Sequence, residues 1–384
     1  MSEWKYLTLN QMGKIARGKS KHRPRNDPRL YGGRYPFIQT ADVKAANLYL
    51  TSYSQTYNED GLAQSKLWPE ETLCITIAAN IADTAILSFP ACFPDSIMGF
   101  QADNNVCLVR YVKYCFDILQ AKCKQISQGA AQDNLSWERL SSIEFPVPAI
   151  ELQIKICSIL SSYDELIENN HKEIKLLEEA AQRLYKEWFI DFKFPGHETT
   201  PIDPETNLPE GWRKGILSDI AEFKRGKTIT AAQAEKGTIP VVAGGLEPAY
   251  YHSKANAKGP VVTISASGAN AGFTRLYTTD IWASDCSFLS ADASRVFLFV
   301  YESVKCIGRN FKHLQRGSAQ PHVYPSHINS MEMLIPTVHY QVAFCETVKP
   351  FISQISILHR SIEDAKEARD RLLPKLMSGE IEVN

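Results

Sequence analysis

The chain has 384 residues, and its 42 Lys and Arg nearly balance its 43 Asp and Glu, for a formal net charge of −1. This length leaves room for two domains with cores of their own, and the neutral total argues against a uniformly basic nucleic-acid-binding protein. No stretch is apolar and long enough for a signal peptide or a membrane span, and the nine cysteines show no zinc-binding or C-x-x-C spacing. We therefore expect a cytoplasmic protein with reduced thiols and no metal site.

The chain contains an internal repeat. Near the start of each copy the matching residues stand 208 positions apart (212 − 4): Trp4, Leu9, Arg17, Gly18 and Lys19 recur as Trp212, Leu217, Arg225, Gly226 and Lys227. Further on the shift falls to 188 (317 − 129): Gly129, Ala131, Gln132, Glu144, Pro148 and Gln153 recur as Gly317, Ala319, Gln320, Glu332, Pro336 and Gln341. A repeat of this length is a whole domain with its attached helix, not a solenoid unit. The first copy is 20 residues longer (208 − 188), and the extra residues lie between Lys19 and Gly129. We expect two heads with a common framework and different middles.

Each head consists of short apolar runs broken by Gly, Pro, Asn and Asp. Residues 73–78 (LCITIA) and 106–112 (VCLVRYV) predict strands in the first head, and 260–265 (PVVTIS) and 295–301 (RVFLFVY) predict strands in the second. Both heads should therefore be mixed α/β domains with a strand-rich body.

The spacing of apolar residues changes after each head. Apolar residues from 156 to 188 step by four and three without a break, and the same stripe returns from 344 to 376, which is the pattern of a coiled-coil seam. Each seam corresponds to roughly 50 Å of helix. The two helices should pack on each other, antiparallel, within the chain; the alternative is that each covers its own head. Asn170 is polar and would set the register of the pair. Pro374 should kink the second helix or end it early.

The predicted fold is α+β, with two strand-rich α/β heads in a pseudo-twofold repeat joined by two long helices in an antiparallel intramolecular coiled coil. Between the first helix and the second head, residues 194–211 are rich in Pro, Thr and Glu and predict an extended linker. The predicted boundaries are 1–149 for the first head, 150–193 for the first helix, 194–211 for the linker, 212–337 for the second head and 338–384 for the second helix.

Local charge is uneven although the total is neutral. Between Lys14 and Arg34 eight Lys and Arg stand with the single acid Asp27, and a second basic run, residues 305–316, lies just before Gly317. The acids concentrate instead on the predicted helices. This segregation indicates basic faces for phosphate groups. The alternative is that both runs are ordinary solvated loops.

Residues 13–20 (GKIARGKS) match the phosphate-loop pattern G-x-x-x-x-G-K-[ST] letter for letter. A phosphate loop needs a buried strand before it and a helix that starts at its lysine. The residues that follow, KHRPRNDPR, contain two prolines and cannot continue a helix, and the second copy, 221–228 (AEFKRGKT), lacks the first glycine. We interpret both segments as strand-end turns whose Arg and Lys reach a DNA backbone. The chain has no G-x-S-x-G, H-E-x-x-H or N-P-P-[YF] motif, which favours a binding protein over an enzyme.

Several longer segments resemble one known family: LPEGWRKGILSDIAEFKRGKTIT as the start of a unit, PVPAIELQIKI and LIPTVHYQVAF as the passage from head to helix, and AAQRLYKEWFIDF and RDRLLPKLMSGEI as the helix ends. Together they resemble the DNA-specificity subunit of type I restriction-modification systems over essentially the whole chain. The resemblance implies that each head is a target-recognition domain that reads one half of a bipartite, asymmetric sequence in double-stranded DNA. It implies that the helices set the gap between the half-sites and bind two methyltransferase subunits, which restriction/translocase subunits join. S-adenosylmethionine, ATP and Mg would then belong to the partner subunits, and this chain would carry no catalysis.

The residues expected to bind DNA come from the basic runs and from the repeat. The candidates for phosphate contacts are Arg17, Lys19, Lys21, Arg23, Arg25, Arg225, Lys227, Arg309, Lys312 and Arg316. Gln132 and Gln320, at matching turns, could read adenine or brace the turn. Because residues shared by both heads cannot explain different targets, base specificity is expected in the unmatched middles. A stand-alone bivalent DNA-binding scaffold and a phosphate-loop ATPase are the alternatives left open.

Overall fold

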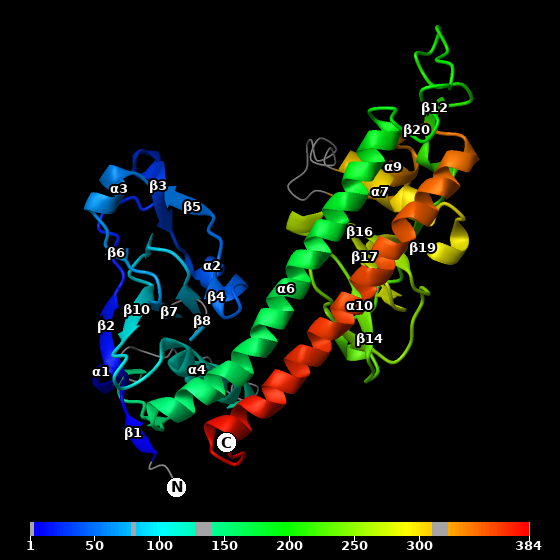
Figure 1. Cartoon of the computed structure of the whole chain (residues 1–384). Helices are drawn as coiled ribbons and strands as arrows, with labels where there is room; N and C mark the ends of the chain where they lie inside the picture. Colours follow the sequence, from blue (N-terminus) through cyan, green and yellow to red (C-terminus); the bar gives the residue numbers. More distant parts are fainter. Residues whose placement is uncertain (1–3, 78–81, 127–139, 309–321, 384) are drawn as a thin grey trace. The chain divides into compact units, whose positions relative to one another are not determined.

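The computed structural model describes residues 4–77, 82–126, 140–308 and 322–383. The chain divides into two compact units, the first formed by residues 1–171 and 360–384 and the second by residues 172–359. Helices α6 (Ile150–Phe189) and α10 (Val338–Met377), green and red in Figure 1, each contribute one part to each unit. Each unit therefore contains one head and a stretch of both long helices.

A sheet of mostly antiparallel strands forms the centre of the first unit. Its strands in spatial order are β2 (Gly13–Arg17), β10 (Ile97–Ala102), β7 (Leu73–Thr76), β8 (Thr84–Leu87) and β4 (Tyr49–Leu50). Strands β7 and β8 are buried along their whole length. The strand predicted at 73–78 is thus confirmed as β7, and its continuous apolar run is explained by burial on both faces.

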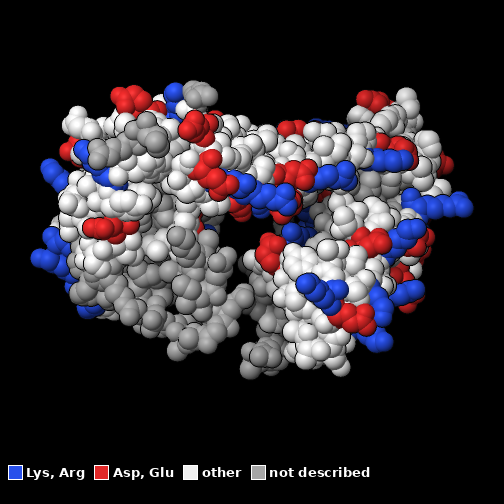
Figure 2. Space-filling model, turned by 90° about the horizontal axis from the view of Figure 1, so that it is seen from below, with Lys and Arg blue, Asp and Glu red and all other residues white. Residues whose placement is uncertain are grey.

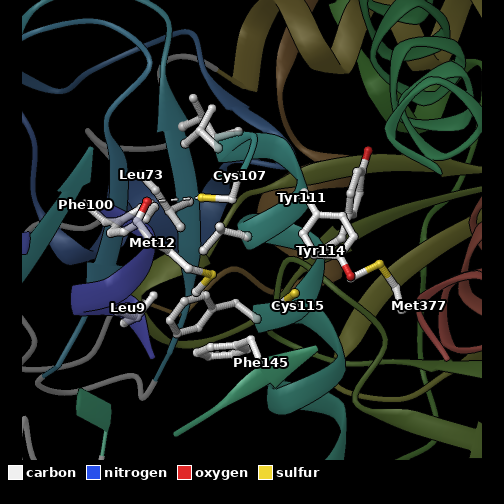
Figure 3. Close-up of a cluster of buried hydrophobic side chains, with 14 of the residues drawn as sticks. Leu9, Met12, Leu73, Phe100, Cys107, Tyr111, Tyr114, Cys115, Phe145 and Met377 are labelled. Carbon is white, nitrogen blue, oxygen red and sulfur yellow. Dashed lines mark hydrogen bonds between the residues drawn. The ribbon is translucent and has the colours of Figure 1, made fainter. Parts of the chain in front are cut away.

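The other elements of the first unit surround this sheet. A second sheet contains β5 (Gln55–Tyr57), β3 (Tyr31–Phe37), β9 (Ala91–Cys92) and β6 (Leu67–Trp68), and β1 (Lys5–Leu7) pairs with β11 (Phe145–Val147). The helices are α1 (Leu9–Met12), α2 (Thr40–Ala45), α3 (Glu59–Ala63) and α4 (Val109–Ile126), and Pro28–Leu30 forms a 3-10 turn. Figure 3 shows side chains of α1, the sheet, α4 and the end of α10 meeting in one buried cluster, where the Cys107 thiol donates to the Met12 carbonyl at 3.3 Å.

The second unit repeats the central frame of the first. Its main sheet has the order β13 (Lys224–Arg225), β19 (Cys286–Ser290), β16 (Val261–Ser265) and β17 (Thr274–Tyr277), which matches β2, β10, β7 and β8 strand for strand. The prediction of a strand at 260–265 is confirmed by β16. The remaining elements are β12 (Arg213–Ile216) with β20 (Glu332–Ile335), β15 (Tyr250–His252) with β14 (Ile239–Val242) and β18 (Trp282–Ala283), and helices α7 (Phe297–Gly308) and α9 (Pro325–Asn329).

Strand register shows where the two heads diverge. Thr76 lies opposite Ile97 in the first head, and Ser265 lies opposite Cys286 in the second, so the shift between the copies at this point is 189 (265 − 76). The shift is still 208 at the first strand of each frame. Nearly all of the extra residues of the first head therefore lie between β2 and β7, in the segment that carries α2, α3 and strands β3 to β6.

Two predicted strands are wrong. Residues 106–112 lead into helix α4, and residues 295–301 comprise a turn and the start of helix α7. Almost every side chain in the first turns of α7 is buried, so the apolar residues run on without a helical period. A short continuous apolar run does not distinguish a buried strand from a buried helix, because both bury every side of the element.

The two long helices pack along the predicted seam within each unit. In the first unit Ile156 and Leu160 of α6 share a buried cluster with Leu376 of α10, and the Asn170 Nδ2 donates to Ser361 Oγ at 3.0 Å. In the second unit Trp188, Phe189 and Tyr185 of α6 pack around Phe344 of α10. The start of one helix thus lies beside the end of the other in both units, which confirms the antiparallel coiled coil.

Pro374 does not end the second helix early, and whether it kinks the helix stays a prediction. Helix α10 passes through Pro374 and ends at Met377. A proline inside a helix removes one backbone hydrogen bond. Leu373, Leu376 and Met377 are buried in the first unit's core, and this burial offsets the loss.

The segment between α6 and the second head is not an extended tether. It contains turns, and an isolated bridge joins Ile202 to Pro209. Phe194 is buried, with its ring 4.8 Å from that of Trp212 and 4.5 Å from that of Tyr340. The aromatic residues therefore anchor this segment on the second unit, a contact that its Pro-, Thr- and Glu-rich composition does not reveal.

Candidate nucleic-acid interface

A tight turn follows strand β2 in the first head. The Gly18 N–H donates to the Ile97 carbonyl at 2.8 Å, and the Lys19 N–H donates to the Phe93 carbonyl at 2.9 Å. A Cβ added to Gly18 would lie 2.3 Å from the Pro94 carbonyl oxygen. The glycine is required because the backbone of the loop before β10 passes directly beside it.

The second head contains the same turn after β13. The Gly226 N–H donates to the Cys286 carbonyl at 2.9 Å, and the Lys227 N–H donates to the Ala283 carbonyl at the same distance. A Cβ on Gly226 would lie 2.3 Å from the Ser284 carbonyl oxygen. Both copies of Arg-Gly-Lys therefore have one structural basis: the backbone of the Gly and the Lys is fixed to the sheet.

These turns are not phosphate loops. No helix begins at Lys19; the chain continues irregularly, and the next helical residues are the 3-10 turn Pro28–Leu30. Lys227 is likewise followed by residues outside any helix until the turn Ala231–Gln233. A phosphate loop depends on a helix N-terminus that faces the phosphates, and neither segment provides one.

Three of the predicted residues in the first head carry unpaired charge. Arg17 and Lys21 are exposed and Lys19 is partly exposed. Within the part of the chain that the structure describes, their side chains form no ion pair. Free cationic groups on either side of a fixed turn are suited to phosphate oxygens.

The other basic residues of this run are paired, which the sequence did not indicate. Arg23 and Arg25 both form ion pairs with Asp95, and Arg34 pairs with Glu59. Both acids lie far from the run along the chain, so the expectation that Asp27 is its single acid holds only for the linear sequence. The folded surface here is less basic than the run suggests.

Asp27 forms hydrogen bonds with other residues of the same basic run. Arg29 donates to both of its carboxylate oxygens, and His22 Nε2 lies 2.9 Å from one of them. Hydrogen bonds from Arg29 hold the pKa of Asp27 well below its usual range. The carboxylate therefore organises the loop and removes Arg29 from the set of free cations.

In the second head, the two predicted residues of the turn differ. Lys227 is exposed and forms no ion pair within the described residues. Arg225 donates from Nη2 to Asp285 Oδ1 at 2.7 Å, and its guanidinium carbon lies 5.8 Å from the centre of the Tyr324 ring. The other carboxylate oxygen of Asp285 accepts a hydrogen bond from the Ser267 hydroxyl. Arg225 is therefore held, whereas Lys227 is free.

The remaining predicted residues cannot be placed. Arg309, Lys312, Arg316, Gln132 and Gln320 lie outside the described residues, so their roles stay predictions. On the face drawn in Figure 2, the coloured basic and acidic side chains are interspersed, and no wide area is wholly basic.

Sequence reasoning missed the acids and aromatic groups of this site. Asp95, Asp285, Ser267 and Tyr324 reach their partners only through strand pairing and loop packing over long sequence separations. The internal repeat could have drawn attention to the loop before β10 and β19, because that loop meets the Arg-Gly-Lys turn in both heads. It could not have identified which side chains meet.

Two general features of the described residues bear on the class of protein. They contain no group of three or more His, Cys, Asp or Glu side chains that could hold a metal ion. None of the helices described is both long and apolar enough to cross a membrane. The geometry defined so far is that of a two-headed protein with a fixed basic turn on each head and two paired helices.

Comparison with known proteins gives the family. The model of the type I restriction modification DNA specificity domain matches residues 1–179 and 209–367, and the chain belongs to this family. The two matches correspond to the two heads with their helices.

The relatives match this chain over nearly its whole length. The chain is similar to the MjaIX specificity subunit of a type I restriction enzyme from Methanocaldococcus jannaschii, with 25% identity over 99% of this chain and 94% of that protein. It is also similar to the MjaVIII specificity subunit of the same organism, with 19% identity over 99% of this chain and 93% of that one. A crystal structure of a type I system S subunit from M. genitalium has the same fold, with a TM-score of 0.56, 16% identity and coverage of 98% and 96% of the two chains.

Proposed function

We propose that this chain is the DNA-specificity subunit of a type I restriction-modification complex, in which each head reads one half of a bipartite, asymmetric target. The observation that carries the proposal is the repeat of the family domain over 1–179 and 209–367. Each copy has the same strand frame and the same Arg-Gly-Lys turn. Two similar heads with different middles suit a target with two different half-sites.

We assign the phosphate contacts to the lysine and arginine side chains at the turns that form no ion pair. Arg17, Lys19 and Lys21 in the first head and Lys227 in the second are accessible and without an ion pair among the described residues. Each such contact releases condensed counterions and makes binding dependent on salt. Arg23 and Arg25 are paired with Asp95, whose negative charge would oppose a phosphate contact. We therefore expect them to contribute less to DNA affinity.

Base specificity belongs to the segments that differ. In the first head this is the stretch between β2 and β7, and in the second the shorter stretch between β13 and β16. The strand frame is common to both heads, so its main role is to position the segments that carry the reading residues. Target differences then follow from the insertion that separates the two copies.

The helices are the proposed site for the partner subunits. Both expose large apolar side chains away from the seam: Ile154, Leu166 and Leu176 on α6, and Val338, Val342 and Ile357 on α10. Such side chains gain free energy when a partner covers them. We assign this surface to methyltransferase subunits, with S-adenosylmethionine, ATP and Mg on the methyltransferase and restriction subunits and no catalytic step on this chain.

The test is methylation mapping of genomic DNA from cells that express the chain with methyltransferase subunits. Replacing residues 21–128 with the equivalent segment of another family member should change one half-site and leave the other half and the gap as they were. Lengthening α6 and α10 by one turn each, about 5.4 Å, should widen the gap by about one or two base pairs. A head exchange that altered both half-sites would contradict the assignment. So would an assembled, active complex whose gap ignored the longer helices.

A further inference from the structure

The two heads share an arginine whose surroundings differ. Arg17 lies opposite Met98, and Arg225 lies opposite Ser287, so the two arginines occupy equivalent register positions in the strand frame. The loop before this strand carries one acid in each head, Asp95 in the first and Asp285 in the second. Counted from the carbonyls of Pro94 and Ser284, which lie beside the two glycines, these acids occupy the same position. Asp95 pairs with Arg23 and Arg25, whereas Asp285 pairs with Arg225. The loop carboxylate therefore binds the arginine of the turn in the second head and other arginines in the first.

Arg225 is held from two sides. Its Nη2 donates to Asp285 Oδ1 at 2.7 Å, and the Tyr324 ring lies beside the guanidinium at 5.8 Å. Asp285 is oriented in turn, because its second oxygen accepts from the Ser267 hydroxyl. The Arg225 side chain remains 40% exposed, so a ligand can still reach it.

This arrangement changes what the arginine can contribute to DNA binding. The ion pair with Asp285 cancels much of the positive charge that a phosphate contact depends on. It leaves further guanidinium N–H donors available and fixes their plane. Oriented paired donors match the O6 and N7 acceptors of guanine in the major groove, which is the most common specific contact made by arginine.

We propose that Arg225 reads a guanine in the half-site of the second head, with Asp285 and Ser267 as positioning residues, whereas Arg17 contacts a phosphate. The inference rests on the function proposed above and adds a residue-level difference between the heads. An arginine common to both heads can then help to distinguish their targets, because the loop carboxylate binds it in only one of them.

The experiment compares three variants of the full chain, each expressed with methyltransferase subunits. Arg17→Ala removes one free charge. The double variant Arg225→Ala with Asp285→Ser removes the ion pair without changing the net charge. Asp285→Ser alone removes the carboxylate partner and leaves Arg225 in place. For each assembled complex, the methylated motif is mapped and DNA affinity is measured as a function of salt.

Removing Arg17 and removing Arg225 should change DNA binding in different ways. Arg17→Ala should leave the motif unchanged and lower the salt slope of log affinity by about one. The double variant should keep the salt slope and lose the preference for one guanine, by about ten- to a hundredfold. Asp285→Ser should weaken the same preference and raise affinity for unrelated DNA, because it frees the charge of Arg225. The half-site of the first head stays intact in every variant and serves as the control for folding and assembly.

The contrary results are equally specific. If Asp285→Ser tightens binding to all sequences and preserves the motif, or if the double variant lowers the salt slope with the motif intact, Arg225 is a phosphate contact and the inference fails. A second half-site without a G·C pair also overturns it. If the unaltered complex shows no bipartite motif at all, the proposed function fails first.

Discussion

Arg369 of α10 donates from Nη1 to Asp164 Oδ1 of α6 at 2.6 Å, and the Tyr114 hydroxyl of α4 donates to the other carboxylate oxygen at the same distance. Asp164 is almost fully buried. Burial alone would lower the pKa of Arg369, but the hydrogen bonds and charges of Asp164 and Asp370 outweigh it and raise that pKa. This contact joins the first head to both long helices.

The ion pair between Asp164 and Arg369 should contribute strongly to the stability of the first unit. Arg369→Met leaves the buried carboxylate of Asp164 without the charge of Arg369, and Asp164→Asn leaves Arg369 with Asp370 alone. Each variant should lower the free energy of unfolding by about 3 kcal/mol. This is the low end of the range for buried pairs, because the Arg369 side chain is 24% exposed. Chemical denaturation of the two single variants and the double variant measures the effect. If the double variant lost as much as the two single losses added together, the two residues would act independently and the contact would be structurally minor.

In the coiled coil, the stability lost on substitution with Asp should depend on whether the position is buried in the seam or exposed. Leu160 and Ile355 are buried, so replacing either with Asp should cost about 3 kcal/mol or more. Leu166 and Ile357 lie on the same helices but are 44% and 58% exposed, and they provide matched controls. Leu166→Asp or Ile357→Asp should keep the unfolding midpoint and reduce co-purification with methyltransferase subunits. Equal stability of Leu160→Asp and Leu166→Asp in denaturation would mean that the seam is not buried in solution.

The glycine of the basic turn should be structurally necessary. Gly226→Ala places a Cβ 2.3 Å from a backbone oxygen, so the turn must move away from the sheet at a cost of about 1–3 kcal/mol. Thermal melting and DNA binding should both suffer. Lys227→Ala is the control, since it removes the exposed charge and leaves the turn in place, so only DNA binding should fall. Unchanged melting of Gly226→Ala would show that the turn tolerates a side chain and that the close approach is not a constraint.

Burial raises the pKa of Glu302 above its ordinary value of 4.5, although the charge of Lys305 and a hydrogen bond from Gln182 act in the opposite direction. The folded protein therefore holds this proton more tightly than the unfolded chain. Its contribution to stability is complete below pH 4.5 and is lost as the pH rises through the folded-state pKa. Glu302→Gln should gain stability relative to the natural chain over that pH range, measured by urea denaturation at several pH values. A constant difference in stability between Glu302→Gln and the natural chain over that pH range would contradict the prediction.

Lys19 separates the two interpretations of its motif. Lys19→Ala keeps the backbone hydrogen bond to Phe93, so the turn should persist. DNA affinity should fall and the salt slope should decrease by about one, as for one lost phosphate contact. Binding of ATP to the natural chain, lost in this variant, would instead restore the phosphate-loop interpretation.

The sequence alone determined the repeat, the two long helices and the seam between them. These features depend on periods that recur over tens of residues, so a local ambiguity at one position does not alter them. The register residue Asn170 was identified for the same reason, and its bond to Ser361 shows that the pattern specified the partner face of the helix.

Only the tertiary structure decided which apolar runs are helices and which basic residues are free. Residues 106–112 and 295–301 bury several sides, and burial of that kind erases the period that separates a helix from a strand. Asp95 and Asp285 meet their arginines across turns that strand pairing brings together. A charge in the sequence has no fixed neighbour until the sheet forms, and this is why the free and the held arginine of the repeat look identical before folding.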